Sequence, residues 1–304
     1  MLTIDLVIII ITKSMVLTCI SCKLLEHIVL SNIRHQLDTQ LNSNQYGFRQ
    51  GLSCTTMELL FYLLYWEIIL VPCVQLSWSP LTTVDGIMKI MDDNISVHAA
   101  ILDFSKAFDK VPHGPLIAKL INTGIDTTIV VRRWIEIFWF DRHQRVVVEG
   151  VSSSCLAVTS GVPQGSVLGP SLFLVYINGI CDNLRASTIR LCADDALLYC
   201  PINSPVDSFY FQHDLNMLGR WAEQWGMEFN TDKCQIVGFN RQDSVVNCTY
   251  FLNGKPLEQV SNCKYLGIKV SNNFDWDMHI NSVTAKASQR LGMIKLFCSM
   301  RLGR

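Results

Sequence analysis

The amino-acid sequence predicts an α+β domain, in which helices pack on one face of a mixed β-sheet. Three observations lead to this prediction. The apolar run VHAAILDF at residues 97–104 is typical of a buried strand. Residues 144–161 and 191–200 each contain two β-rich runs joined by turn residues, which indicates hairpins. Stretches with helical spacing lie between these segments, so strands and helices are interspersed along the chain.

The elements can be placed in order after about residue 95. Residues 112–124, PHGPLIAKLINTG, predict a helix that ends at Gly124. The hairpin at 144–161 follows, and then the apolar helix candidate GPSLFLVYINGI at 169–180. The second hairpin, at 191–200, comes next. Residues 227–239 and 250–270 predict further short strands, with an Asn-Gly turn at 253 and 254.

One helix is marked by apolar residues at steps of four and three, which places them on a single face. These residues are Phe211, Leu215, Leu218, Ala222 and Trp225. Asp214, Arg220 and Glu223 are expected largely off that face.

Overall charge does not indicate a nucleic-acid partner. The 304 residues include 25 Lys and Arg against 26 Asp and Glu, a formal charge of −1. Local charge is more informative, because five basic residues and no acidic one lie between Thr284 and the end. This segment would suit a phosphate backbone, and a solvated basic helix end is the alternative. The five are Lys286, Arg290, Lys295, Arg301 and Arg304.

The cysteines and the apolar runs are informative about the cellular compartment and about membrane association. Twelve cysteines, mostly single within apolar segments, predict reduced thiols of an intracellular protein, nuclear or cytoplasmic. The run LVIIII at residues 6–11 follows Asp5 and is too short to span a bilayer, so no signal peptide is predicted. The apolar residues 59–76 contain Glu67 and Pro72, which makes them a weak membrane candidate, and no membrane partner is predicted with confidence.

Two adjacent aspartates stand between apolar runs in LCADDALLYC at residues 191–200. Pairing of these runs would place Asp194 and Asp195 at the tip of a tight hairpin. Such a tip is either an ordinary polar turn or a site where a cation offsets two repelling carboxylates. Asp103 ends a predicted strand 91 residues earlier. If that strand lies beside the hairpin, the carboxylates meet, and hard oxygen donors without His or Cys suit Mg²⁺ or Mn²⁺.

A glycine-containing loop, SGVPQGSVLGPSLF, separates the two acidic segments. Its glycines suggest a phosphate loop, but the lysine of a P-loop is missing. Two readings are left: a bent loop with Gln164 as a polar finger, which lets a backbone or base approach closely, and an ordinary turn from hairpin to helix.

Six motifs occur together in one order: QYGFRQGLS, LDFSKAFDKVPH, SGVPQGSVLGPSLF, CADDALLY, WGMEFNTDKCQIVGF and CKYLGIKV. As a set they resemble the reverse transcriptases of non-LTR retrotransposons of the jockey-like kind. The resemblance implies a right-hand polymerase fold with a palm, partial fingers and only the start of a thumb. It also implies an RNA-directed DNA polymerase that uses deoxynucleoside triphosphates to extend a DNA primer on an RNA template.

The resemblance assigns the catalytic and metal-binding roles by position. Asp103 and Asp194 would bind two Mg²⁺ (or Mn²⁺) ions, and Asp195 would support that site. Lys233, in FNTDK, matches a lysine that would protonate the pyrophosphate, and a solvated lysine is the alternative.

The resemblance also assigns contacts to nucleotide and primer. Phe108 matches a steric gate against a ribose 2′-hydroxyl, and a core aromatic is the alternative reading. Tyr265, Leu266 and Gly267 match a hairpin that grips the primer. The remaining nucleotide-binding candidates are Phe104, Gln164, Gly165, Arg49 and Lys13.

The resemblance divides the chain into four parts. Residues 1–15 do not match the family, 16–96 are the fingers, 97–270 the palm and 271–304 the start of the thumb. An apolar stretch at 57–81 interrupts the fingers and is interpreted as an insertion or unremoved intron, so the chain is interpreted as a truncated and possibly degenerate copy.

Two positions depart from the family. Cys192 replaces an aromatic residue, and Lys13 replaces an arginine that would clamp the triphosphate. The alternatives to a polymerase of this kind are an inactive nucleic-acid-binding remnant and an RNA-directed RNA polymerase. The latter class usually has Asp at the position of Phe108.

Overall fold

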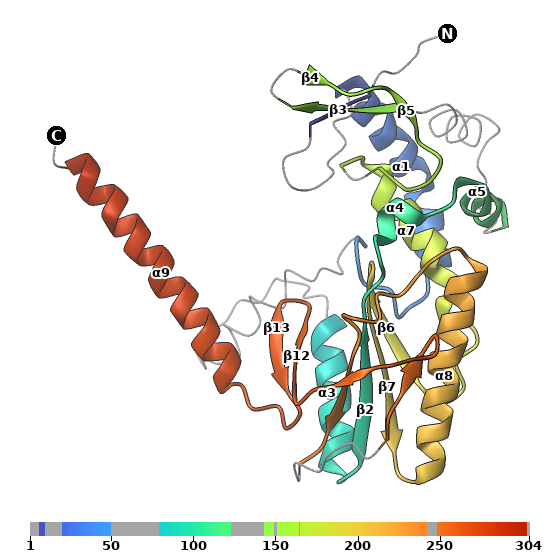
Figure 1. Cartoon of the computed structure of the whole chain (residues 1–304), viewed down its shortest axis with the longest axis vertical. Helices are drawn as coiled ribbons and strands as arrows, with labels where there is room; N and C mark the ends of the chain where they lie inside the picture. Colours follow the sequence, from blue (N-terminus) through green and yellow to red (C-terminus); the bar gives the residue numbers. More distant parts are fainter. Residues whose placement is uncertain are drawn as a thin grey trace.

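A five-stranded sheet forms the centre of the computed structural model, which describes residues 6–9, 20–49, 79–122, 143–148, 151–163, 165–241 and 248–302. The strand order is β11-β8-β2-β7-β6, so β2 lies in the middle (Figure 1). Pairing is antiparallel except between β11 and β8. The bounds are β2 (Ser96–Leu102), β6 (Thr188–Cys192), β7 (Asp195–Ile202), β8 (Gln235–Phe239) and β11 (Glu258–Gln259).

Both faces of this sheet are covered, because side chains alternate along each strand. Ala100 and Leu102 belong to a core shared with α7 (Leu168–Ile177) and α8 (Pro205–Gln224). Val97 and Ala99 belong to a second core, with residues of α3 (Ser79–Asp92).

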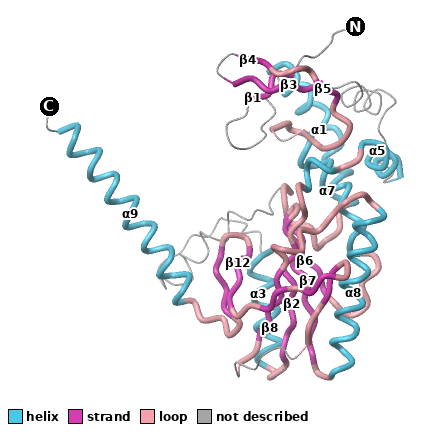
Figure 2. Tube along the Cα trace, in the orientation of Figure 1, coloured by secondary structure: helices cyan, strands magenta, loops and turns pink. Residues whose placement is uncertain are grey.

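A hairpin of β12 (Asn262–Tyr265) and β13 (Ile268–Ser271) completes the second core. Figure 2 shows α3 and α8 on opposite sides of the strands. The prediction that helices pack on one face was therefore wrong. It was drawn from the element order after residue 95 and did not count α3, which precedes that point.

The described residues also form further helices. They are α1 (Ile20–Gln40), α4 (Ala107–Lys110), α5 (His113–Asn122), the 3-10 helix η1 (Asn178–Cys181) and α9 (Asp277–Leu302). The remaining strands form a sheet of β1 (Leu6–Ile9), β3 (His143–Val148), β4 (Val151–Ser152) and β5 (Leu156–Ala157), and a ribbon of β9 (Phe251–Leu252) and β10 (Lys255–Pro256).

The apolar face predicted for α8 is confirmed for four of its five residues, because Trp225 lies just beyond the helix end at Gln224 and is only partly buried. Phe211, Leu215, Leu218 and Ala222 are buried. Asp214, expected off that face, is completely buried as well. Its carboxylate accepts hydrogen bonds from the backbone N–H groups of residues 185, 186 and 187, at 3.0, 3.1 and 2.8 Å. Asp214 therefore anchors the loop that leads into β6.

The C-terminal helix α9 projects away from the sheet (Figure 1). Lys286, Arg290 and Lys295 are exposed along it. Within the described ranges, no helix is long and apolar enough to cross a membrane. The weak membrane candidate at residues 59–76 and the stretch 57–78 of the predicted insertion lie outside the described residues.

The cysteines agree in part with the prediction of reduced thiols. Six described cysteines are free, among them the buried Cys200, Cys234 and Cys263. Cys192 departs from the prediction, because its sulfur is disulfide-bonded.

Candidate active site

The hairpin of β6 and β7 carries the aspartate pair. Cys192 pairs with Asp195, so Ala193 and Asp194 form the two-residue loop. The tip therefore differs from the prediction by one position, since Asp195 begins β7. Ala193 adopts a φ of 57°, in the left-handed region that residues other than glycine enter at a cost.

Asp103 lies at the same end of the sheet. Leu102 of β2 pairs with Ala196 of β7, and one further step of this register sets Asp103 level with Asp195. The Asp103 backbone is held in place, because its carbonyl accepts a hydrogen bond of 2.8 Å from the Asn230 N–H. The sequence-based hypothesis that Asp103 and the aspartate hairpin meet depended on strand pairing, and that pairing is present.

The carboxylates influence each other electrostatically. Partial desolvation and then the charge of Asp103 raise the pKa of Asp194, although a backbone hydrogen bond acts in the opposite direction. Desolvation, Asp194 and Asp103 together raise the pKa of Asp195 to about 6, despite the opposing charge of Lys264. The site thus concentrates more negative charge than nearby cations offset, a condition that favours a bound cation.

Lys233 lies beside this group, with its Nζ 3.4 Å from Oδ2 of Asp103 and its side chain 67% exposed. Within the described part of the chain, no three His, Cys, Asp or Glu side chains come close enough to form a complete metal cage. The donors nevertheless suit Mg²⁺. This ion commonly takes one or two carboxylates and completes its shell with waters and substrate phosphates.

Phe104, which follows β2, and Phe108, in the SKAFDK segment, have different surroundings. Phe104 is 4% exposed and stacks on Phe229 with ring centroids 4.3 Å apart, so its side chain belongs to the core. Phe108 is half-buried, stacks on Phe173 at 4.3 Å and meets Phe48 edge-on at 6.2 Å. Only the second ring is placed to contact a ligand.

The glycine-containing loop leads into α7, whose N-terminus is already occupied by a protein carboxylate. Glu26 of α1 is completely buried, and its Oε2 accepts hydrogen bonds from the backbone N–H groups of Val167 and Leu168, at 2.6 and 3.0 Å. A phosphate at this helix end would have to displace it. Gly165 is exposed with a φ of 99°, and Gln164 lies outside the described residues.

Arg49 is engaged inside the protein. Its guanidinium donates to the carbonyls of Asp38, Asn42 and Gln45 at 3.0 to 3.2 Å, and its side chain is 16% exposed. Its predicted contact with phosphate or template is therefore replaced, in this structure, by a role in fixing the loop after α1. Lys13, the other basic candidate, lies outside the described residues.

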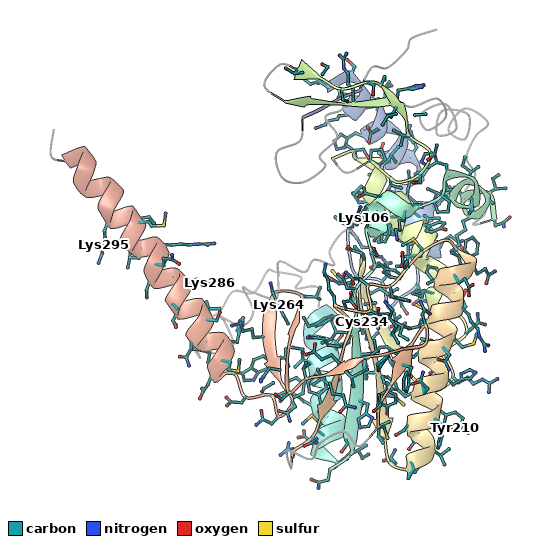
Figure 3. All side chains as sticks on the ribbon, in the orientation of Figure 1. Lys106, Tyr210, Cys234, Lys264, Lys286 and Lys295 are labelled. Carbon is teal, nitrogen blue, oxygen red and sulfur yellow. The ribbon has the colours of Figure 1, made fainter. Side chains whose placement is uncertain are left out.

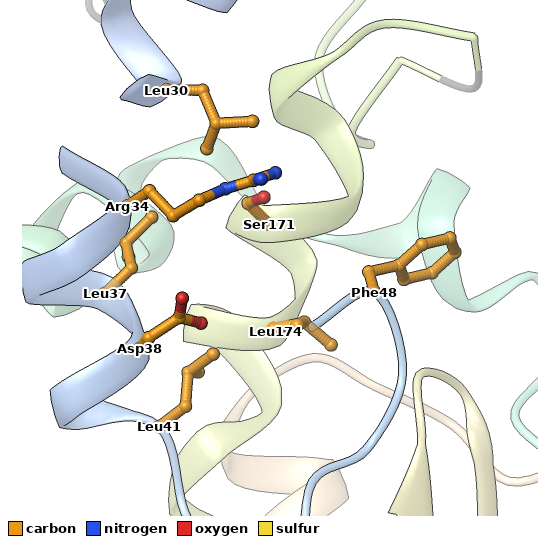
Figure 4. Close-up of a pocket in the computed structure, with 8 residues that line it drawn as sticks. All are labelled: Leu30, Arg34, Leu37, Asp38, Leu41, Phe48, Ser171 and Leu174. Atoms are coloured by element: carbon orange, nitrogen blue, oxygen red, sulfur yellow. The ribbon is translucent and has the colours of Figure 1, made fainter. Parts of the chain in front are cut away.

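A small pocket opens between α1 and α7 near this loop (Figure 4). Arg34, Asp38, Phe48 and Ser171 line it together with leucines. None of the predicted site residues belongs to this lining, so the pocket is separate from the carboxylate site.

The hairpin of β12 and β13 approaches the carboxylates from the second face. Leu266 and Gly267 form its two-residue loop, with φ values of 47° and 89°. Tyr265 is 7% exposed, and burial followed by the negative charge of Asp195 raises the pKa of its hydroxyl. Lys264 stands at the end of this hairpin in Figure 3, and Lys286 and Lys295 lie along α9 beyond it.

Comparisons with known proteins agree with one another. Residues 13–270 match the family described as reverse transcriptase (RNA-dependent DNA polymerase). The RNA-directed DNA polymerase from mobile element jockey of Drosophila melanogaster is 30% identical over 206 residues, covering 64% of this chain and 22% of the relative. The probable RNA-directed DNA polymerase from transposon BS of the same species is 29% identical over 265 residues, covering 84% and 26%.

A solved structure shares the fold. Apo telomerase from Candida tropicalis, truncated from its C-terminal domain, superposes with a TM-score of 0.50 at 10% identity, over 81% of this chain and 45% of that one. The chain spans about a quarter of the length of the two curated relatives.

Proposed function

Because the chain belongs to the reverse transcriptase family, we propose that it is an RNA-directed DNA polymerase of a non-LTR retrotransposon, which extends a DNA primer on an RNA template with deoxynucleoside triphosphates. The observation that carries this proposal is the alignment of Asp103 with the Asp194–Asp195 hairpin at one end of the central sheet. The jockey and BS relatives are named as RNA-directed DNA polymerases, so an RNA-directed RNA polymerase is not favoured.

Asp103 and Asp194 would hold divalent cations, with Asp195 beside them. Both are hard oxygen donors, and the pKa of Asp194 is raised first by burial and then by the charge of Asp103, a repulsion that a cation would offset. When bound, Mg²⁺ lowers the pKa of an attacking hydroxyl and neutralises phosphate charge. Lys233, which is 67% exposed next to Asp103, would donate a proton to the departing pyrophosphate.

The remaining elements fit the division into fingers, palm and thumb. The central sheet with α8 would form the palm, and α1 with its following loop the fingers. The exposed basic side chains of α9 and Lys264 of the neighbouring hairpin would contact the phosphates of the template and primer. The half-buried Phe108 ring would exclude a ribose 2′-hydroxyl.

Primer extension on an RNA template tests this function. Asp103→Asn should abolish Mg²⁺-dependent extension and leave template binding within about twofold of the parent, because it removes a metal ligand and no phosphate contact. The matched control is Asp93→Asn, an exposed residue just before the opposite end of β2, which should extend normally. Normal extension by Asp103→Asn would refute the assignment.

A further inference from the structure

The loop after α1 pairs with the edge of the central sheet next to the catalytic hairpin. Gln45 forms a parallel bridge with Leu191 of β6. The Leu191 carbonyl accepts from the Tyr46 N–H at 2.8 Å, and the Leu191 N–H donates to the Asn44 carbonyl at 2.9 Å. Residues 44–46 therefore act as one more short strand, added to β6 just before the aspartate turn.

The side chain of Gln45 reaches the turn itself. It is completely buried, and its Oε1 accepts from the Ala193 N–H at 3.1 Å and the Gly47 N–H at 2.9 Å. Ala193 is the residue with a left-handed φ of 57°, next to Asp194. A strained conformation persists only where its surroundings hold it, and Gln45 supplies such a hold.

The backbone at Gly47 packs closely against the same turn. A Cβ built at position 47 would lie 3.0 Å from the carbonyl carbon of Cys192 and would clash with the backbone nitrogen of Ala193. Glycine is thus required here for space. Arg49 donates hydrogen bonds to the carbonyls of Asn42 and Gln45 and so holds the backbone of this loop in place.

We propose that Gln45 is a positioning residue that fixes the Ala193–Asp194 turn, so that Asp194 is held at the same end of the sheet as Asp103 for metal binding. It contacts neither the metal nor the substrate and acts through the Ala193 N–H. This inference rests on the proposed function for the binding of metal by Asp103 and Asp194. The hold on the turn follows from the hydrogen bonds alone.

The test compares two readouts that do not need polymerase activity. Gln45→Met keeps the length of the side chain and removes the acceptor. It should speed amide hydrogen exchange in the peptide covering residues 188–196 by at least about tenfold. Titration with Mn²⁺ alone, followed by electron paramagnetic resonance, should show binding about tenfold weaker, the scale of losing an outer-shell support.

Two further variants separate positioning from general destabilisation. Gln45→Glu retains oxygen acceptors at the same place, and because burial beside the aspartates favours its protonated form, it should keep exchange slow. Ser204→Ala removes the cap of α8 near the far end of β7 and should leave both readouts at the parent values.

The proposal is overturned if Gln45→Met keeps parental exchange, if exchange rises without any loss of Mn²⁺ affinity, or if Ser204→Ala reproduces both losses. It is also overturned if the parent binds no Mn²⁺. A parent that binds Mn²⁺ and fails to extend a primer would refute the proposed function alone, and the two readouts would still decide the role of Gln45.

Discussion

Asp214 and Asp194 are both held close to β6, and their surroundings are opposite. Asp214 is completely buried and receives three backbone N–H groups. Burial alone would raise its pKa, but hydrogen bonds from Arg185, Ser187 and their neighbours hold that pKa below its ordinary value. Asp194 lies in a turn beside other carboxylates, and its pKa is raised. A carboxylate that is satisfied within the chain stabilises the fold, whereas one left unsatisfied indicates a partner from outside.

Phe104 and Phe108 differ in a similar way, because one side chain is enclosed by the protein and the other is not. The first ring is enclosed by the core, and the second keeps part of its surface open beside Phe48. Local sequence placed both in one motif, and only their packing shows which ring is enclosed by the core and which keeps an accessible surface.

The largest expected effect is that of Asp194→Asn on catalysis. Extension should fall about a thousandfold, because transition-state charge loses its stabilisation. Stability should stay the same or rise at pH 7. The folded-state pKa of Asp194 lies above its unfolded value, so the charged form is less favourable in the folded state, and Asn removes that penalty. Denaturant unfolding of both proteins measures this, and a large loss of stability would contradict the comparison.

At the other aspartate of the comparison, Asp214→Ala should destabilise the fold by about 3 to 4 kcal/mol, since it leaves three backbone donors without an acceptor. Extension per folded molecule should remain close to that of the parent. Glu223→Ala, an exposed position on the same helix, is the control and should change stability by less than about 0.5 kcal/mol. Equal effects of the two variants in urea unfolding would count against Asp214 as an anchor.

His98 extends the comparison to the interior of β2, the strand that Asp103 follows. It is 8% exposed, its Nδ1 lies 2.6 Å from the Tyr250 hydroxyl, and burial lowers its pKa to about 4. Between pH 6.5 and 4 the unfolded chain binds a proton at this residue and the folded chain does not. The free energy of unfolding should therefore decrease as the pH is lowered from 6.5 to 4, by up to about 3 kcal/mol. His98→Gln should flatten the pH dependence of unfolding, and an unchanged slope would exclude His98 as its source.

The smallest expected effect concerns the choice of sugar. Phe108→Val should lower the preference for deoxynucleotides over ribonucleotides by about thirtyfold, since the discrimination is steric. Phe104→Val should instead cost about 2 kcal/mol of stability and keep the preference, because its ring fills the core. Incorporation efficiencies for the two sugars decide between them. A drop in preference caused by Phe104→Val would remove the distinction between the two rings.

Local patterns in the sequence were enough to predict β2, the hairpin of β6 and β7, α7 and the apolar face of α8, because each depends on neighbouring residues. They could not reveal the polar anchors. The bond from Ala193 to Gln45 joins residues 148 positions apart, and that from Val167 to Glu26 spans 141. Asp214 was misplaced because its charge was interpreted as a sign of exposure, although it stands three residues after Phe211, a step that sets both on one helix face. The carboxylate site was predicted because its members lie at or next to strand ends, whereas its supports are polar residues without a distinctive pattern.

The position of β2 in the middle of the sheet has a consequence for synthesis. Its two partners, β7 and β8, begin at Asp195 and Gln235, so its edges stay unpaired until those later segments have left the ribosome. At about 5 to 20 residues per second, this leaves an apolar strand waiting for several seconds. Such a strand is prone to pair with other chains, and pairing this distant in sequence forms slowly. The centre of the described sheet is therefore open to wrong pairing until those later segments have been made.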